Sequence, residues 1–200
     1  MARAFSEQES LVIRERLLEA GRRAVTATGL RKTSIGTLTR AAGISQGAFY
    51  AFFESKEALL VELLRRAETD VRERVEAAAN VGQLSDVIQE IFDAIPKHPL
   101  LRCLSDPDEL AWLSRVLGER FMQEARASDN AWFLALGRRL QRRGVLAGGA
   151  ERQLFASLPH VALGVAQQRQ PLGDRFDATV RCVVEALALR LQPRASKRPK

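Results

Sequence analysis

Apolar residues recur along most of this chain at intervals of three and four positions, which is the spacing of an amphipathic helix. The first such segment covers residues 9–28 and stops at Gly29, a common helix-ending residue. Its predicted buried side consists of Leu11, Leu17, Leu18, Ala24 and Val25. No segment shows the alternation of a strand bounded by turns. The sequence therefore predicts an all-α protein of about nine helices.

Two short helices follow the first. Ser34 can cap one that ends near residues 42–43, and Ser45 can cap another that reaches residue 52, because a serine hydroxyl accepts hydrogen bonds from free N–H groups. Helices of about eight residues are unstable alone, so both must pack on longer neighbours. Gly-Ile-Ser between them has the length of the turn in a helix-turn-helix, and Gly43 tolerates its left-handed backbone.

Longer helices are predicted for the rest of the chain. The first covers residues 56–79 after a capping Ser55, and the second covers 83–95 and stops at Pro96. The third starts at Pro107 after a capping Asp106, and the fourth opens at residues 128–130 and closes at Gly144. The last two run from residues 147–153 to Gln170, with a kink at Pro159, and over 174–191 after a loop. In the helix that starts at Pro107, one face carries Leu110, Leu113, Leu117 and Phe121.

The second short helix has an outward face suited to a DNA major groove. Its first turn presents residues 45–48, so no bulky or acidic side chain blocks base edges or phosphates. Gln46 is the best candidate for base contact, because a Gln amide can pair with adenine through two hydrogen bonds. Gly47 and Ala48 can contact a thymine methyl. The serines at 34 and 45 are helix caps in either case, and this role is compatible with DNA contact.

Aromatic residues crowd the end of this segment. Phe49 and Phe53 are predicted to lie in the core and lock the small helix in place. Tyr50 can present its hydroxyl to a phosphate. Lys56 opens the next helix, where free N–H groups and the helix dipole already favour an anion.

The net charge of +7 is concentrated at the chain ends. Residues 1–60 carry nine basic and six acidic side chains, and the last eight residues carry four basic and no acidic ones. This distribution suits a polyanion-binding N-terminal part followed by a basic tail, although a solubilising surface charge would give the same count.

Residues 33–60, "TSIGTLTRAAGISQGAFYAFFESKEALL", resemble the DNA-binding domain of the TetR family of bacterial transcriptional regulators. The likeness covers roughly residues 11–60 and includes the first helix with "ATGLRKTS". The chain departs from the family pattern at Thr39, where Ala is usual, and at Phe52, where His is usual. The resemblance implies phosphate contacts from Ser34, Thr37, Tyr50 and Lys56. It also implies a base-contacting helix lined or supported by Ser45, Gln46, Gly47, Ala48 and Phe49.

The resemblance further implies a homodimeric repressor that binds a double-stranded DNA operator and responds to a small molecule. It divides the chain into a DNA-binding domain (1–55, with the recognition motif at 34–53), a ligand-binding and dimerisation domain (56–192) and a basic disordered tail (193–200). The effector is expected to be apolar, in a pocket lined by Trp112, Phe121, Phe155 and His160. Core packing is the alternative for each of these residues.

A dimer interface is expected on two late helices, mostly from the same resemblance. Its predicted residues are Leu154, Leu158, Val161 and Val165 on one helix and Val180, Val184, Leu187 and Leu191 on the other. The alternative is that one of these stripes packs inward on its own subunit.

Other function classes lack their motifs. The sequence has no metalloprotease, dinucleotide, phosphate-loop or Ser-x-x-Lys signature, so no catalytic residue, metal or cofactor is predicted. Residues 153–168 lack charge but hold Pro159, His160 and three Gln, which favours a buried helix over a membrane span. A cytoplasmic, nucleoid-associated protein without membrane partners is expected. A DNA-binding regulator without a small-molecule ligand and an all-helical enzyme are the alternatives.

Overall fold

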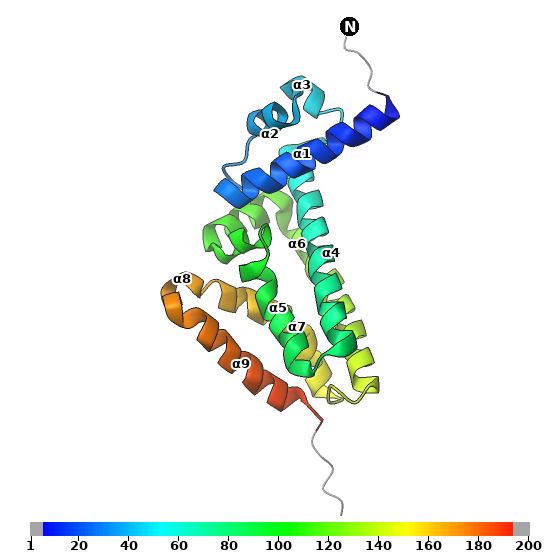
Figure 1. Cartoon of the computed structure of the whole chain (residues 1–200), viewed down its shortest axis with the longest axis vertical. Helices are drawn as coiled ribbons and strands as arrows, with labels where there is room; N and C mark the ends of the chain where they lie inside the picture. The colour runs from blue at the N-terminus through cyan, green and yellow to red at the C-terminus, as the bar shows by residue number, and fades with distance from the viewer. Residues whose placement is uncertain (1–5, 194–200) are drawn as a thin grey trace, which may run out of the picture.

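The computed structural model describes residues 6–193, and the predicted tail beyond Pro193 lies outside them. Within that range the protein consists of helices without any strand, so the predicted all-α class is confirmed (Figure 1). The elements are α1 (Glu7–Thr28), α2 (Ile35–Ala42), α3 (Gln46–Phe49), α4 (Lys56–Val81), α5 (Leu84–Lys97), the 3-10 helix η1 (Leu101–Ser105), α6 (Pro107–Arg142), α7 (Ala150–Ala166), α8 (Arg169–Leu172), the 3-10 helix η2 (Gly173–Arg175) and α9 (Phe176–Leu191).

Two apolar cores stabilise the fold, and α4 runs from one into the other (Figure 1). The first core joins α1, α2 and α3 to the beginning of α4 and is centred on Leu17, Leu38, Phe49 and Leu59. The second joins the end of α4 to α5, the end of α6, α7 and α9, and is centred on Ile88, Phe92, Leu136 and Phe155. Leu11, predicted on the buried side of α1, is instead 63% exposed because it lies beyond the first core.

The predicted serine caps are present. The hydroxyls of Ser34, Ser45 and Ser55 accept hydrogen bonds from the N–H groups of Thr37, Ala48 and Ala58 at 3.1–3.2 Å. Each cap of this kind stabilises a helix by about 1 kcal/mol. For α2 and α3 this is a large share of their stability, because they contain only eight and four residues.

Several predicted boundaries are wrong because hydrogen bonds elsewhere override local signals. α3 ends at Phe49 rather than at residue 52, since the carbonyl of Phe49 accepts from the N–H groups of Phe52 and Phe53 in a tightened turn. α5 continues through Pro96, where only the last turn is affected. α7 continues through Pro159 but ends at Ala166, and α8 occupies part of the predicted loop.

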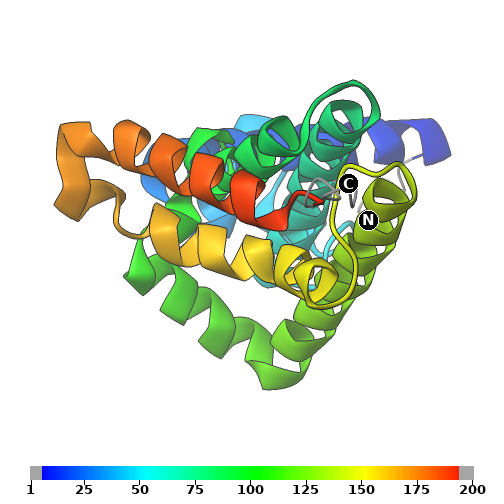
Figure 2. The same ribbon diagram turned by 90° about the horizontal axis from the view of Figure 1, so that it is seen from below.

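α6 replaces two predicted helices. It passes through residues 128–130 without a new start, because Asp129 bonds to Arg72 of α4 at 3.0 Å instead of capping a helix. The interruption lies at Gly118, whose φ of 80° and ψ of 159° are non-helical. Figure 2 shows α6 bending away from the bundle and returning to it.

A buried carboxylate joins α6 to the N-terminal helices. Oε2 of Glu109 accepts hydrogen bonds from the N–H groups of Leu30 (2.7 Å) and Arg31 (3.2 Å), in the loop between α1 and α2. Gly29, with φ 87°, lets this loop approach so closely that an added Cβ would lie 2.9 Å from Oε1 of Glu109. We call this contact the Glu109 clamp.

Replacement of Glu109 by alanine should lower the free energy of unfolding by about 1–3 kcal/mol, because the buried N–H of Leu30 loses its acceptor. Glu109→Gln should lose less, since an amide oxygen can still accept one N–H. Urea unfolding followed by circular dichroism measures both. The control is Asp108→Ala in the same turn, where the side chain is exposed and the loss should not exceed about 1 kcal/mol. Equal losses at the two positions would contradict the clamp.

Candidate functional site

α2 and α3 form a two-helix unit that is held at a tight turn. Gly43 adopts the left-handed conformation (φ 75°, ψ 32°), and the N–H of Ile44 bonds to the carbonyl of Thr39 at 3.0 Å. An added Cβ at Gly43 would meet no atom within 4 Å, so its backbone angles, rather than lack of space, favour glycine. This is the turn that the sequence predicts for a helix-turn-helix.

Buried side chains fix the orientation of α3. Phe49 is fully buried, with its ring centroid 5.8 Å from that of Phe53. Phe49 therefore supports the unit and presents no surface for contact with DNA. Thr39 is also buried, and its hydroxyl donates to the carbonyl of Ile35 at 2.9 Å, so a threonine fits at this helix crossing without an unsatisfied polar group.

The outward face of the unit collects most of the predicted contact residues. Its exposed members are Ser34, Thr37, Ser45, Gln46, Gly47 and Tyr50, with Ala48 half-buried beside them. Arg40 joins this face and was missed by the sequence reasoning, although it follows Thr37 by three positions on α2 and must share its side.

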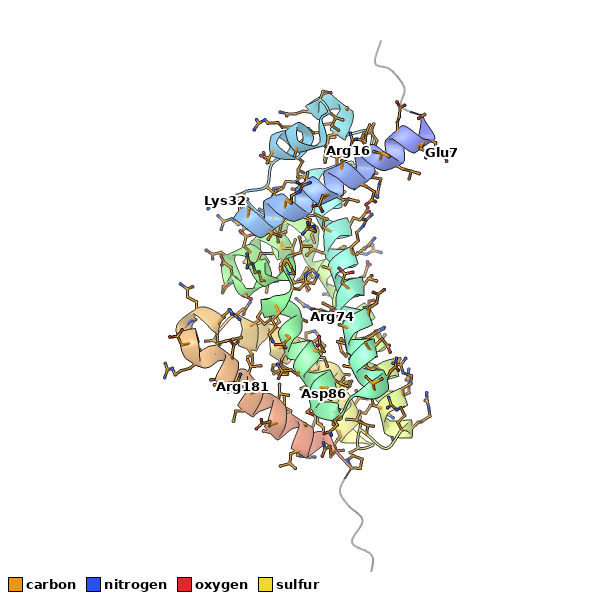
Figure 3. All side chains as sticks on the ribbon, viewed as in Figure 1. Glu7, Arg16, Lys32, Arg74, Asp86 and Arg181 are labelled. Carbon is orange, nitrogen blue, oxygen red and sulfur yellow. The ribbon has the colours of Figure 1, made fainter. Side chains whose placement is uncertain are left out.

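The charge of this region is uniform. Residues 20–53 contain the basic side chains Arg22, Arg23, Arg31, Lys32 and Arg40 and no acidic one. The first two pair with Glu19 of α1, whereas the other three form no salt bridge within residues 6–193. Figure 3 labels Lys32 at the loop that joins α1 and α2. An exposed surface with free positive charge and no carboxylate attracts a polyanion.

Two predicted contact residues rest against the protein itself. The amide of Gln46 lies over Gly36 of α2, where an added Cβ would be 3.1 Å from its nitrogen. The Lys56 ammonium lies 4.6 Å from the centroid of the Trp112 ring of α6, a cation–π distance. Both side chains would have to turn outward to meet a nucleic acid.

Residues 17–63 match the model of the family "Bacterial regulatory proteins, tetR family". The N-terminal part of the chain is therefore similar to the DNA-binding domain of this family. One relative is the HTH-type transcriptional regulator AcrR of Shigella flexneri, 33% identical over 68 residues, which are 34% of this chain and 32% of that protein. The match to the curated relatives thus spans between about a third and a half of their lengths.

Solved structures of transcriptional regulators share the fold of most of this chain. A transcriptional regulator from Cytophaga hutchinsonii superimposes with a TM-score of 0.71 at 15% identity, over 96% of this chain and all of that one. A regulator from Saccharomonospora viridis in complex with choline gives 0.63 at 20% identity, over 86% of this chain and 93% of that one. At these identities the likeness concerns the fold alone.

The C-terminal part of the chain contains a pocket of about 330 Å³ between α4, α5, α6 and α7. Of the four residues predicted to line an effector pocket, Phe121 and His160 line this one. Trp112 does not, because its side chain packs on the N-terminal core, and Phe155 does not, because it is fully buried in the second core. The predicted apolar face of α6 does line the pocket, through Leu110, Leu113, Leu117 and Phe121.

One part of the pocket wall is charged, which the sequence reasoning did not anticipate. Arg72 of α4 pairs with Glu68 one turn earlier and with Asp129 of α6, and its guanidinium lies 5.3 Å from the centroid of the Trp132 ring. Burial and then the nearby Asp129 carboxylate raise the pKa of Glu68. We call Glu68, Arg72, Asp129 and Trp132 the acid–arginine cluster.

The predicted dimer stripes point partly inward. Leu158, Val180, Val184 and Leu191 are at most 4% exposed because they form the second core, and Val165 and Leu187 pack against that core. Periodicity identified an apolar face on each helix but not the direction in which it points. Leu154 and Val161 of α7 are exposed, and Leu189 of α9 is 78% exposed. Figure 2 shows α7 and α9 side by side, so their outer sides adjoin.

Metal binding, membrane insertion and the reactivity of Cys103 can be judged from the described residues. Within the described range no group of three His, Cys, Asp or Glu side chains could hold a metal ion, and no helix is both long and apolar enough to cross a bilayer. Burial raises the pKa of the Cys103 thiol to about 12, so this thiol stays protonated and unreactive at neutral pH.

Proposed function

We propose that this protein is a regulator of the TetR type: a homodimeric repressor that binds a palindromic DNA operator and is released from it by a small molecule. The observation that carries the proposal is the outward face of α2 and α3, which is exposed, rigidly supported and free of acidic side chains. In our proposal residues 1–55 bind DNA, and residues 56–192 bind the effector and form the dimer.

The groove contacts follow from the position of each side chain. Gln46, Gly47 and Ala48 would face base edges, because they form the first turn of α3. Ser34, Thr37, Arg40 and Tyr50 would meet the phosphates on either side, and Lys56 would add a further phosphate contact after leaving Trp112. A two-fold dimer would place two such units on a palindrome.

The route from effector to DNA would run through α6. Leu110, Leu113 and Leu117 line the pocket, while Glu109 and Trp112 of the same segment contact the N-terminal helices. A ligand that displaces this segment would therefore shift α1 and the α2–α3 unit. It would weaken DNA binding to the extent that it binds the displaced arrangement more tightly than the DNA-binding arrangement. The pocket favours this proposal over a regulator without a ligand. The choline complex of the Saccharomonospora viridis protein is consistent with a small ligand in this fold.

Selection of bound sequences from random DNA by the purified protein, at two salt concentrations, tests DNA binding. We expect a palindromic motif bound more weakly at the higher salt. Gln46→Ala should relax the preference at one base position in each half-site at a cost of about 1–3 kcal/mol, because a base-edge pairing is lost. A motif identical to that of the wild type would exclude Gln46 as a base contact.

Arg40→Ala and Lys56→Ala should each weaken binding to all sequences and reduce the slope of log affinity against log salt by about one, because each loses one phosphate contact. Fluorescence anisotropy with the selected operator measures the slope. Arg138→Ala, an exposed arginine on the distant part of α6, is the matched control and should leave it unchanged. A wild-type slope for either variant would remove that residue from the phosphate contacts.

Leu189→Glu and Val161→Glu should convert the protein to monomers, because each buries a charge in the proposed α7–α9 interface. Sedimentation velocity measures the change, and circular dichroism confirms that the helices remain. Val81→Glu is the control, since Val81 is 90% exposed at the end of α4 and outside this face. Dimers that persist in both interface variants would place the interface elsewhere.

A further inference from the structure

The acid–arginine cluster is a cation site that the protein fills with its own side chain. Nη2 of Arg72 lies 3.0 Å from Oδ1 of Asp129, and the same nitrogen pairs with Glu68. The Trp132 ring offers its face to the guanidinium from a third direction. Two carboxylates and an aromatic face are the groups that bind organic cations in proteins.

Two carboxylates share one guanidinium in this cluster. Glu68 and Asp129 both face Arg72, and burial together with the neighbouring Asp129 carboxylate raises the pKa of Glu68. A second cation beside the carboxylates would relieve the repulsion between them, whereas an anion would add to it.

The rest of the wall suits an apolar body. Outside the charged groups the pocket is lined mainly by aliphatic and aromatic side chains, such as Leu64, Ile91, Leu104, Met122 and Phe133. Its volume of about 330 Å³ lies within the usual range for small-molecule sites. A ligand that fills it would bury an apolar chain or ring system and place a polar head at the cluster.

We propose that the ligand of this pocket is an organic cation, with an apolar body among the leucines of α4 and α6 and an ammonium head at Glu68 and Asp129. The inference deepens the proposed function and rests on it for the regulatory role, but not for the binding itself. The head would share the two carboxylates with Arg72, whose guanidinium already lies over the Trp132 ring.

Two further arginines affect whether the pocket prefers a positively or a negatively charged head on its ligand. Arg65 of α4 and Arg126 of α6 also line the pocket, and both side chains are exposed. Their side chains are more exposed than those of Glu68 and Asp129, so water and salt screen their charge more strongly. The carboxylates therefore determine the preference inside the pocket, and the arginines would favour an anion only at its rim.

Three probes with the same alkyl chain, decylammonium, decanol and decanoate, distinguish the contribution of the head group to the affinity from that of the apolar body. Isothermal titration calorimetry on the full-length protein at neutral pH measures each one below its micelle concentration. We expect decylammonium to bind at least about tenfold more tightly than decanoate, because a charged hydrogen bond between the ammonium and a carboxylate contributes that much. Decanol should fall between them.

Variants of the cluster identify the groups that recognise the head. Glu68→Gln and Asp129→Asn should each weaken decylammonium about tenfold and leave decanol unchanged, which also shows that the pocket remains folded. Glu124→Gln is the matched control, because Glu124 is an exposed carboxylate on α6, like Asp129, and pairs with Arg120 outside the pocket. It should bind all three probes like the wild type.

Three results would overturn the inference. The first is tighter binding of decanoate than of decylammonium, together with loss of the decanoate binding in Arg126→Ala. The second is equal affinity for all three probes, and the third is no binding of any of them. Operator release is measured separately by anisotropy. Binding of decylammonium at the cluster without release would contradict the proposed effector response but not the site, whereas release by decanoate or decanol alone would contradict the site but not the response.

Discussion

The carboxylate of Glu109 is the contact on which the arrangement of the two halves depends. It accepts two N–H groups of the α1–α2 loop and is itself nearly buried, so the start of α6 and the end of α1 cannot separate without leaving polar groups unpaired. α4 supplies the second connection, because its side chains belong to both cores. A change in the direction of α6 is therefore transmitted to α1, against which α2 packs.

The interruption of α6 at Gly118 gives its two segments different tasks. The first segment contacts the N-terminal helices through Glu109 and Trp112 and lines the pocket with leucines. The second carries Asp129 to Arg72 of α4 and Phe133 into the second core. A single straight helix could not satisfy both sets of contacts, and a glycine at this point permits the positive φ that separates them.

Sequence reasoning succeeded where a feature depends on a few neighbouring residues. Serine caps, the left-handed Gly43 and the burial of Phe49 follow from local chemistry, and all three are found. It failed where partners come from distant segments. Periodicity gave α7 and α9 an apolar stripe but could not show that Leu158 and Val184 fill their own core. Nor could it place Trp112 beneath Lys56, or join Asp129 to Arg72, because each pair is far apart in sequence.

The opposite charges of the two proposed sites explain why they need a mechanical link. The face of α2 and α3 carries Arg40 and no carboxylate and suits phosphates, whereas the carboxylates of the acid–arginine cluster suit a cation. DNA and such a ligand would therefore not compete for the same side chains. Screening in salt also limits direct electrostatic coupling between sites more than about 10 Å apart. Coupling between them would then need a change in shape, and the first segment of α6 is placed to carry it, because it lines the pocket and binds the loop that leads into α2.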